Sequence, residues 1–177
     1  MTILGAGLSG SLLSTLLSQG DYRVQLFEKR SDPRKSELEE GRSINLALSY
    51  RGWSALARAG LKERVRSRAI AMWGRMMHDE RGNLSFQPYG TDDQAIYSVS
   101  RLGLNQLLID EAEKAGAELF FEHRCEEIYL KQGKAIIHDL NEKESFLTEP
   151  DLLIGADGAF STLRTAMQKT PRYNYSQ

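Results

Sequence analysis

The chain has 177 residues, enough for one domain with a substantial core and too few for two large ones. Its 23 Lys and Arg residues balance 24 Asp and Glu residues, and a net charge of −1 argues against nucleic acid or an anionic membrane as a partner. Because the sequence has a single cysteine, it cannot form an internal disulfide. It contains neither a signal segment nor an apolar run of about 18 residues, so we expect a cytoplasmic protein with no membrane segment in the part shown.

The chain opens with a glycine-rich turn between a short apolar run and a helical pattern. Thr2–Leu4 predicts a strand, and leucines recur at helical spacing over 8–17. The spacing Gly5-x-Gly7-x-x-Gly10 is typical of a dinucleotide-binding unit: its glycines permit the tight turn, the approach of a diphosphate, and close packing of helix on sheet. We expect the diphosphate to face the N–H groups of the first helical turn.

A second strand, 22–27, alternates apolar and polar residues and ends at Glu28. In a dinucleotide-binding unit this is about where an acid binds the ribose hydroxyl pair. The alternative is that Glu28 only solvates the strand end. The polar, charge-dense run that follows, 29–40, predicts a surface loop.

The middle of the chain alternates short strands and helices. The pattern predicts a strand over 44–48, a helix over 51–59, a basic helical piece with a solvated face over 61–68, a hairpin of strands 71–78 and 84–87, and a strand over 95–99. Two arginines remain open at this point. Arg42 is a solvated loop residue or a ligand, and Arg75, set among Trp73, Met76 and Met77, is paired in a cleft or points outward.

Ser100 is expected to cap a helix over 101–115 that ends at Gly116. Arg101 in its first turn opposes the helix dipole, which suggests an anion held in front of it. The residues that follow predict strands over 117–121 and 125–130 and a β-meander that continues through 135–138 and 145–147.

The last informative stretch is a buried strand, 152–154, that leads to the glycine-flanked Asp157 and a helix starting near Ser161. Beside the first strand of a doubly wound sheet, its carboxyl end would lie near the glycine turn. The two motifs would then meet at one ligand.

Together these motifs resemble the group A flavoprotein aromatic hydroxylases, whose fold is similar to that of p-hydroxybenzoate hydroxylase. The motifs are the glycine turn, Glu28 and Asp157-Gly158-x-x-Ser161-x-x-Arg164. Within that group, the stretches 41–52, 88–91, 98–101 and 171–177 look very like the kynurenine 3-monooxygenase family. The resemblance covers essentially the whole chain.

The resemblance implies an α/β fold, a Rossmann-like FAD-binding domain of the GR2 type with a parallel sheet and a small β-meander. Residues 1–177 would be the N-terminal part of a longer monooxygenase, and 70–99 would contribute the start of its substrate-binding sheet. In eukaryotic members a C-terminal region anchors the enzyme to the outer mitochondrial membrane.

The same resemblance implies the site residues. FAD would be bound by Gly5, Gly7, Ser9, Gly10, Phe27, Glu28, Lys29, Arg30, Arg42, Leu46, Arg101, Cys125, Asp157, Gly158 and Thr162. Arg75 would grip the substrate carboxylate, with Tyr89 sharing it. No metal ligand and no classical catalytic residue are expected.

The reaction implied is hydroxylation of L-kynurenine to 3-hydroxykynurenine. NADPH would reduce FAD, and O₂ would add to give a flavin C4a-hydroperoxide that transfers one oxygen. The isolated 177-residue piece is expected to be inactive. Two alternatives remain: a related flavin hydroxylase of another aromatic acid, and a non-catalytic FAD- or nucleotide-binding module.

Overall fold

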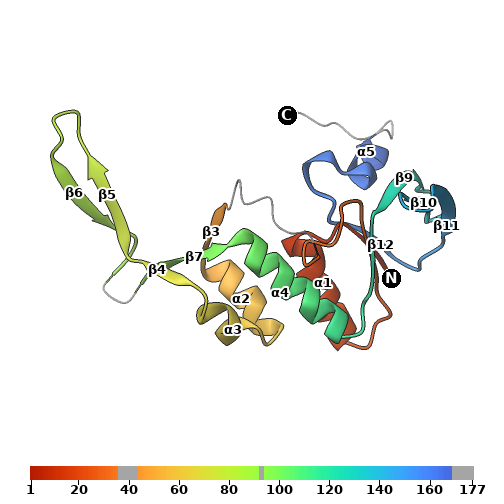
Figure 1. Ribbon diagram of the computed structural model, residues 1–177, viewed down its shortest axis with the longest axis horizontal. Coiled ribbons are helices and arrows are strands. Elements are labelled where there is room, and N and C mark those ends of the chain that lie inside the picture. The colour runs from red at the N-terminus through yellow and green to blue at the C-terminus, as the bar shows by residue number, and fades with distance from the viewer. Residues whose placement is uncertain (36–43, 92–93, 169–177) are drawn as a thin grey trace. The chain divides into compact units, whose positions relative to one another are not determined.

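The computed structural model describes residues 1–35, 44–91 and 94–168 (Figure 1). The chain divides into two compact units, Met1–Leu38 with Asn105–Gln177 and Glu39–Leu104. Helix α4 (Arg101–Lys114) carries the chain from the second unit back into the first. Within the described residues, no helix combines the length and the apolar character needed to cross a membrane.

A four-stranded parallel sheet forms the centre of the first unit. Its order is β12 (Leu153–Gly155), β1 (Thr2–Leu4), β2 (Gln25–Glu28) and β8 (Glu118–Phe121), with every neighbouring pair parallel. The expected neighbourhood of the first and last strands is confirmed, because Leu4 of β1 is in register with Gly155 of β12. Figure 1 shows β12 near the N-terminus of the chain.

The two faces of this sheet are covered by different elements. Ile3 and Leu26 lie in a core cluster with Ala112 of α4, against which Leu13 and Leu17 of α1 (Leu8–Gln19) also pack. Leu4 and Phe27, which are register partners, lie in a second cluster with Ile137 of the meander. Alternation along β1 and β2 therefore sends successive side chains to opposite layers.

The predicted meander is confirmed as an antiparallel sheet of β9 (His123–Tyr129), β10 (Lys134–Asp139) and β11 (Glu144–Thr148) in the order β11-β10-β9. Ile137 of β10 is fully buried in the cluster that covers the parallel sheet. After β12 the chain forms a 3₁₀ turn (Gly158–Phe160) and helix α5 (Thr162–Gln168).

The most deeply buried side chains of α1 are small polar residues and not its leucines. Ser11, Ser14 and Thr15 are buried, whereas the leucines of α1 are half-buried. Each buried hydroxyl is satisfied within the segment, since Ser14 donates to the Gly10 carbonyl at 2.8 Å and Thr15 to the Ser11 carbonyl at 3.0 Å. Small residues let the helix axis approach the sheet closely.

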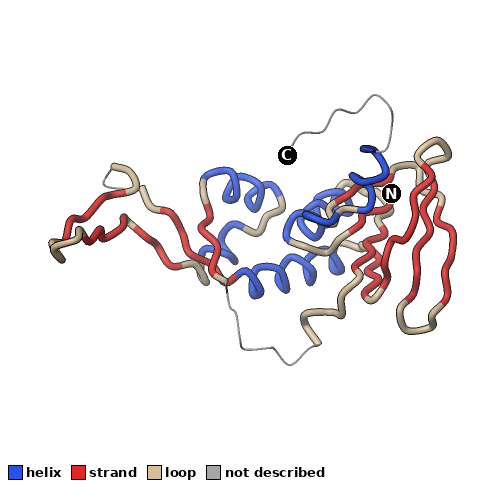
Figure 2. Tube along the Cα trace, turned by 90° about the horizontal axis from the view of Figure 1, so that it is seen from above, coloured by secondary structure: helices blue, strands red, loops and turns tan. Residues whose placement is uncertain are grey.

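The second unit contains a three-stranded antiparallel sheet and a separate hairpin. The sheet has the order β3 (Asn45–Leu48), β7 (Ile96–Ser100), β4 (Ile70–Met72). Helices α2 (Tyr50–Arg58) and α3 (Lys62–Arg66) lie between β3 and β4 in sequence, and the hairpin is β5 (Gly74–His78) with β6 (Leu84–Pro88), seen at the left of Figure 2.

The prediction of one continuous strand over 71–78 is wrong at Trp73. The segment changes partner there, because β4 pairs with β7 while β5 pairs with β6. The Trp73 carbonyl instead accepts a hydrogen bond from the Tyr89 N–H at 2.9 Å. A period-2 pattern indicates extended backbone but does not reveal which strand it pairs with.

The glycine turn depends on close backbone contacts. Gly5 has a φ of +99°, and a Cβ added there would lie 2.6 Å from the Ala156 carbonyl oxygen. A Cβ on Gly10 would lie 1.9 Å from the Gly5 carbonyl oxygen. The first turn of α1 therefore lies directly on the backbone of the preceding turn.

Replacing Gly10 by alanine should lower the free energy of unfolding by about 3 kcal/mol, because its methyl group would meet a backbone oxygen that cannot move aside. Gly103→Ala is the matched control, since its added Cβ meets only Ser100 at 3.6 Å and alanine favours the helix by about 1 kcal/mol. Urea unfolding of both variants measures the difference. Equal stability of Gly10→Ala and the parent chain would contradict this packing.

Candidate functional site

The glycine turn and the Asp157 segment lie together at the carboxyl ends of neighbouring strands. The turn follows β1 directly, and the segment follows β12, its parallel partner. The Ala156 N–H donates to the Leu4 carbonyl at 2.7 Å, and the Gly5 N–H donates to the Phe27 carbonyl of β2 at the same distance. The structure thus brings these two predicted motifs to one edge of the sheet.

Among the described residues, the N-terminus of α1 is open. Gly7 is its N-cap, and a Cβ placed there would meet no described atom within 4 Å. In this part of the chain no side chain caps the helix, and its first turn contains no acid. Amide N–H groups with partial positive charge and no competing carboxylate suit an anion such as a diphosphate. The exposed Ser9 lies in this turn.

Glu28 at the end of β2 is buried and holds the turn in place. One carboxylate oxygen accepts from the Ala6 N–H at 2.9 Å, and the other accepts from the Arg30 N–H at 3.0 Å and its Nε at 3.1 Å. Glu28 is therefore not a solvated strand end. A carboxylate has about four lone-pair directions, so one remains for a ribose hydroxyl donor.

Asp157 orders the segment on the other side of the turn. Its Oδ2 accepts from the Thr162 N–H at 2.8 Å, which caps the start of α5, while Oδ1 is buried with no hydrogen-bond partner among the described residues. Thr162 also donates through Oγ1 to the Cys125 carbonyl at 3.4 Å. This oxygen lies 3.2 Å from where a Cβ on Gly155 would be.

Phe27 and Cys125 are two of the residues expected at the cofactor. The Phe27 side chain is buried and stacks on Phe120 with a centroid separation of 4.8 Å. Burial raises the pKa of the Cys125 thiol to about 12, with the charges of Asp157 and Glu126 adding to the shift. Lys29, Arg30 and Gly158 are exposed.

The remaining expected residues belong to the second unit. Leu46 is half-buried on β3, and Arg101 is exposed at the start of α4, where its N–H donates to the Ile44 carbonyl at 3.1 Å. Ser100 caps this helix as expected, accepting from the Gly103 N–H at 3.2 Å. Arg42 lies outside the described residues.

Arg75 lies in the hairpin β5–β6 and Tyr89 directly follows it. Arg75 is opposite Gln87, whose side-chain oxygen accepts from the Arg75 Nε at 2.8 Å. The Tyr89 N–H donates to the Trp73 carbonyl at 2.9 Å. Both residues are exposed in the described part of the chain.

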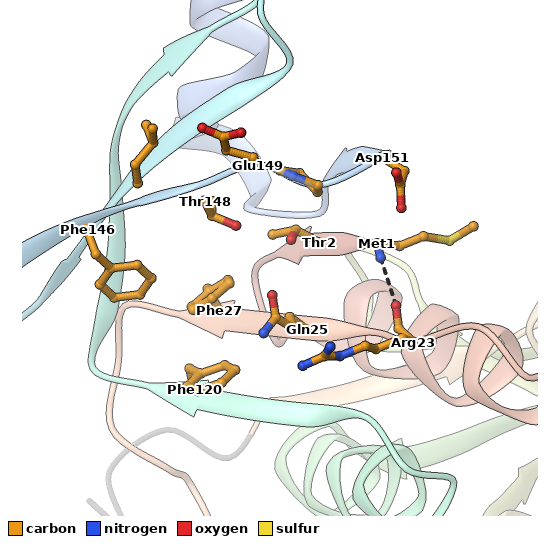
Figure 3. Close-up of a pocket in the computed structure, with 12 residues that line it drawn as sticks. Met1, Thr2, Arg23, Gln25, Phe27, Phe120, Phe146, Thr148, Glu149 and Asp151 are labelled. Atoms are coloured by element: carbon orange, nitrogen blue, oxygen red, sulfur yellow. Dashed lines mark hydrogen bonds between the residues drawn. The ribbon is translucent and has the colours of Figure 1, made fainter.

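A separate cavity of about 420 Å³ lies at the opposite end of the strands (Figure 3). Thr2 and Gln25, the first residues of β1 and β2, line it together with the rings of Phe27, Phe120 and Phe146. Because the glycine turn follows the last residue of β1, this cavity is distinct from the crevice at the turn.

Sequence reasoning missed several residues that shape the crevice. Ala6 donates to Glu28, and Ala156 packs on Gly5, but neither alanine carries a chemical signal. Asp32 and Arg34 form a bidentate pair after β2 that a charge-dense loop did not suggest. Their i,i+2 spacing with Pro33 between them was the available signal for an ordered turn.

Comparison with known proteins agrees with this geometry. A family model described as FAD binding domain matches residues 1–173. A kynurenine 3-monooxygenase of Cytophaga hutchinsonii is 44% identical over 171 residues, covering 96% of this chain and 38% of that protein. A kynurenine 3-monooxygenase of Anopheles gambiae is 42% identical, covering 100% of this chain and 37% of that protein. The chain thus spans less than half the length of these relatives.

Solved structures are similar at the level of the fold. The flavin-dependent monooxygenase PieE, solved with FAD and substrate, has a TM-score of 0.78 at 19% identity and covers 94% of this chain and 31% of its own. The p-nitrophenol 4-monooxygenase PnpA of Pseudomonas putida DLL-E4 has a TM-score of 0.75 at 20% identity, covering 94% and 42%. The predicted α/β fold with a parallel sheet is confirmed.

The raised pKa of Cys125 predicts low thiol reactivity. At pH 8 iodoacetamide should alkylate the folded chain at least about 100-fold more slowly than the urea-unfolded chain, because only the thiolate reacts and an ordinary cysteine has a pKa of about 8.5. Mass spectrometry of time points measures both rates. Equal rates would show that the thiol is neither buried nor shifted.

Proposed function

Because the chain belongs to the FAD binding domain family, we propose that it is the FAD-binding part of a flavin monooxygenase that hydroxylates L-kynurenine. The observation that carries the FAD assignment is the uncapped N-terminus of α1, open at Gly7 and next to Glu28. The substrate assignment rests on the relatives, whose names are kynurenine 3-monooxygenase at 42–45% identity.

The residues present fit FAD by their chemistry. Amide N–H groups at Gly7 and Ser9 suit the diphosphate, and the fourth lone-pair direction of Glu28 suits a ribose hydroxyl, with Lys29 and Arg30 beside it. The further residues that we propose to hold the cofactor are Gly5, Gly10, Phe27, Arg42, Leu46, Arg101, Cys125, Asp157, Gly158 and Thr162.

Arg75 and Tyr89 form the proposed contact with the substrate carboxylate. The hydrogen bond to Gln87 uses one of the five N–H donors of Arg75, so four remain for a substrate. Its terminal nitrogens form a rigid fork that matches a carboxylate, and the Tyr89 hydroxyl can donate to the same group. Residues 70–99 are accordingly proposed as the start of the substrate-binding sheet.

In the overall reaction, L-kynurenine, O₂, NADPH and a proton give 3-hydroxykynurenine, NADP⁺ and water. Bound FAD supplies the redox and oxygen-transfer chemistry. The residues of this chain bind and orient the cofactor and substrate, and none is assigned as an acid, base or nucleophile. We propose that the 177 residues alone do not complete this reaction.

The direct test is NADPH oxidation by the full-length protein supplied with FAD, with and without L-kynurenine, and with the product identified by mass. Kynurenine-stimulated oxidation and a product heavier by one oxygen are expected. If FAD binds but kynurenine has no effect, the substrate is another aromatic acid, and a panel of such acids in the same assay identifies it. If FAD binds but no acid stimulates NADPH oxidation, the chain is a cofactor-binding module without this activity.

Gly7→Val should abolish FAD retention while leaving the fold intact. The valine side chain would fill the space in front of the helix N-terminus, yet the φ of −71° and the absence of described atoms within 4 Å make the substitution sterically acceptable. Flavin absorbance of the purified protein gives the FAD content. Gly20→Ala at the other end of α1 is the control and should retain FAD; full occupancy of Gly7→Val would refute the assignment of the turn.

Arg75→Ala should weaken L-kynurenine binding in the full-length protein by at least about tenfold, and Tyr89→Phe by a smaller factor, because each removes a donor to a carboxylate. FAD content should stay unchanged. Arg81→Ala, in the turn of the same hairpin, is the matched control. Titration of the flavin spectrum with kynurenine measures the affinity, and unchanged affinity in both variants would remove these residues from the substrate site.

A further inference from the structure

Arg34 connects the segment after β2 to helix α4 by an arrangement that the proposed function does not use. Its guanidinium forms a bidentate pair with the buried Asp32, with Nε to Oδ1 at 3.0 Å and Nη2 to Oδ2 at 2.8 Å. Its third nitrogen, Nη1, donates to Asp110 at 3.0 Å and to Glu113 at 2.7 Å, both on α4. We call these four residues the Arg34 clasp.

Two further contacts fix the same segment. The Gln106 side chain of α4 donates to the Pro33 carbonyl at 2.8 Å. The Arg34 guanidinium also lies 5.8 Å from the ring centroid of Phe121 on β8. The segment is therefore held against two elements of the first unit by side chains of different chemistry.

The pKa values of Asp32 and Arg34 indicate a favourable ion pair between them. Burial alone would raise the pKa of Asp32, but hydrogen bonds and the charge of Arg34 outweigh it and hold that pKa below its usual range. The bond to Asp32 also raises the pKa of Arg34. Asp32 and Arg34 are thus both charged at neutral pH, and the Arg34 side chain is only about one-fifth exposed, so solvent screens this pair incompletely.

The clasp holds one end of a short segment whose other end is Glu28. Glu28 accepts two hydrogen bonds from Arg30, and the Arg30 carbonyl accepts the Glu122 N–H at 3.1 Å. Lys29 and Arg30 lie between these two fixed points. The residues expected at the adenosine ribose are thus held at one end by their bonds to Glu28 and Glu122, and are joined at the other end through Ser31 to the Asp32–Arg34 pair.

Helix α4 does not need the clasp to stay in place. Leu107, Leu108, Ile109 and Ala112 of this helix are buried, and the burial of their apolar side chains holds it in place. Asp110 and Glu113 are about half exposed. Loss of the two acids should weaken the attachment of the segment to α4, with the Gln106–Pro33 bond still in place, and should leave the helix packed.

We propose that Arg34 is a positioning residue for cofactor binding, which holds the segment Glu28–Arg30 in the geometry that receives the adenosine half of FAD. The inference rests on the proposed function, since it assumes that this crevice binds FAD. It assigns to Arg34, Asp110 and Glu113 a role in cofactor affinity without contact to the cofactor.

The test uses full-length apoprotein and measures dissociation constants for FAD and for ADP by calorimetry, together with the unfolding midpoint and kcat at saturating FAD. ADP contains the adenosine and diphosphate but no flavin. The variants are Asp110→Ala with Glu113→Ala, and Arg34→Lys, which keeps the charge but loses the bidentate fork. Lys114→Ala removes an exposed ion pair with Glu111 on the same helix and is the matched control.

The double variant should raise both dissociation constants about fivefold, in line with about 1 kcal/mol for two partly exposed charge-assisted bonds. Arg34→Lys should raise them by a similar factor. In both variants, the unfolding midpoint and kcat at saturating FAD should equal those of the parent protein. The affinity of Lys114→Ala for FAD and ADP should also equal that of the parent. A loss of affinity without a loss of stability distinguishes a positioning role from a general structural role.

The proposal is overturned if the double variant binds ADP as tightly as the parent protein, or if its affinity loss is matched by Lys114→Ala. It is also overturned if affinity falls only together with the unfolding midpoint. A parent protein that binds neither FAD nor ADP would instead refute the proposed function itself, and the inference with it.

Discussion

The structure depends on the contact between the first turn of α1 and the backbone that precedes it. A Cβ at Gly10 would lie 1.9 Å from the Gly5 carbonyl oxygen, and one at Gly5 would lie 2.6 Å from the Ala156 carbonyl oxygen. The glycine turn and the Ala156 segment, far apart in sequence, therefore meet with backbone against backbone at the edge of the sheet. Because no side chain separates them, the N–H groups of the helix end are available to a ligand. Glu28 locks this arrangement by accepting the Ala6 N–H.

Two packed layers lie behind the glycine turn. Register-paired side chains of β1 and β2 alternate between a layer with α1 and α4 and a layer with the meander. The small buried residues of α1 bring that helix close, and the hydroxyls of Ser14 and Thr15 donate to carbonyls of its own backbone. The glycine turn thus follows a strand that is packed on both faces, which limits the reorganisation needed when a ligand binds.

Much of this was predictable, for identifiable reasons. The glycine spacing, Ser100 as a helix cap and the neighbourhood of β1 and β12 all follow from local chemistry or from the rules of parallel sheets. The change of partner at Trp73 was not predictable, because alternation does not encode pairing. The Arg34 clasp was also missed: its acids on α4 are more than seventy residues away in sequence, and only folding brings them to one guanidinium.

We propose that the N-terminus of α1, supported by Glu28, receives the diphosphate and ribose of FAD. A crystal structure of the full-length protein grown with FAD would show this site. We expect diphosphate oxygens within hydrogen-bond distance of the N–H groups at Gly7 to Ser9, and a ribose hydroxyl donating to Glu28 while the Ala6 bond persists. FAD bound elsewhere, or a Glu28 carboxylate turned away from the cofactor, would contradict it.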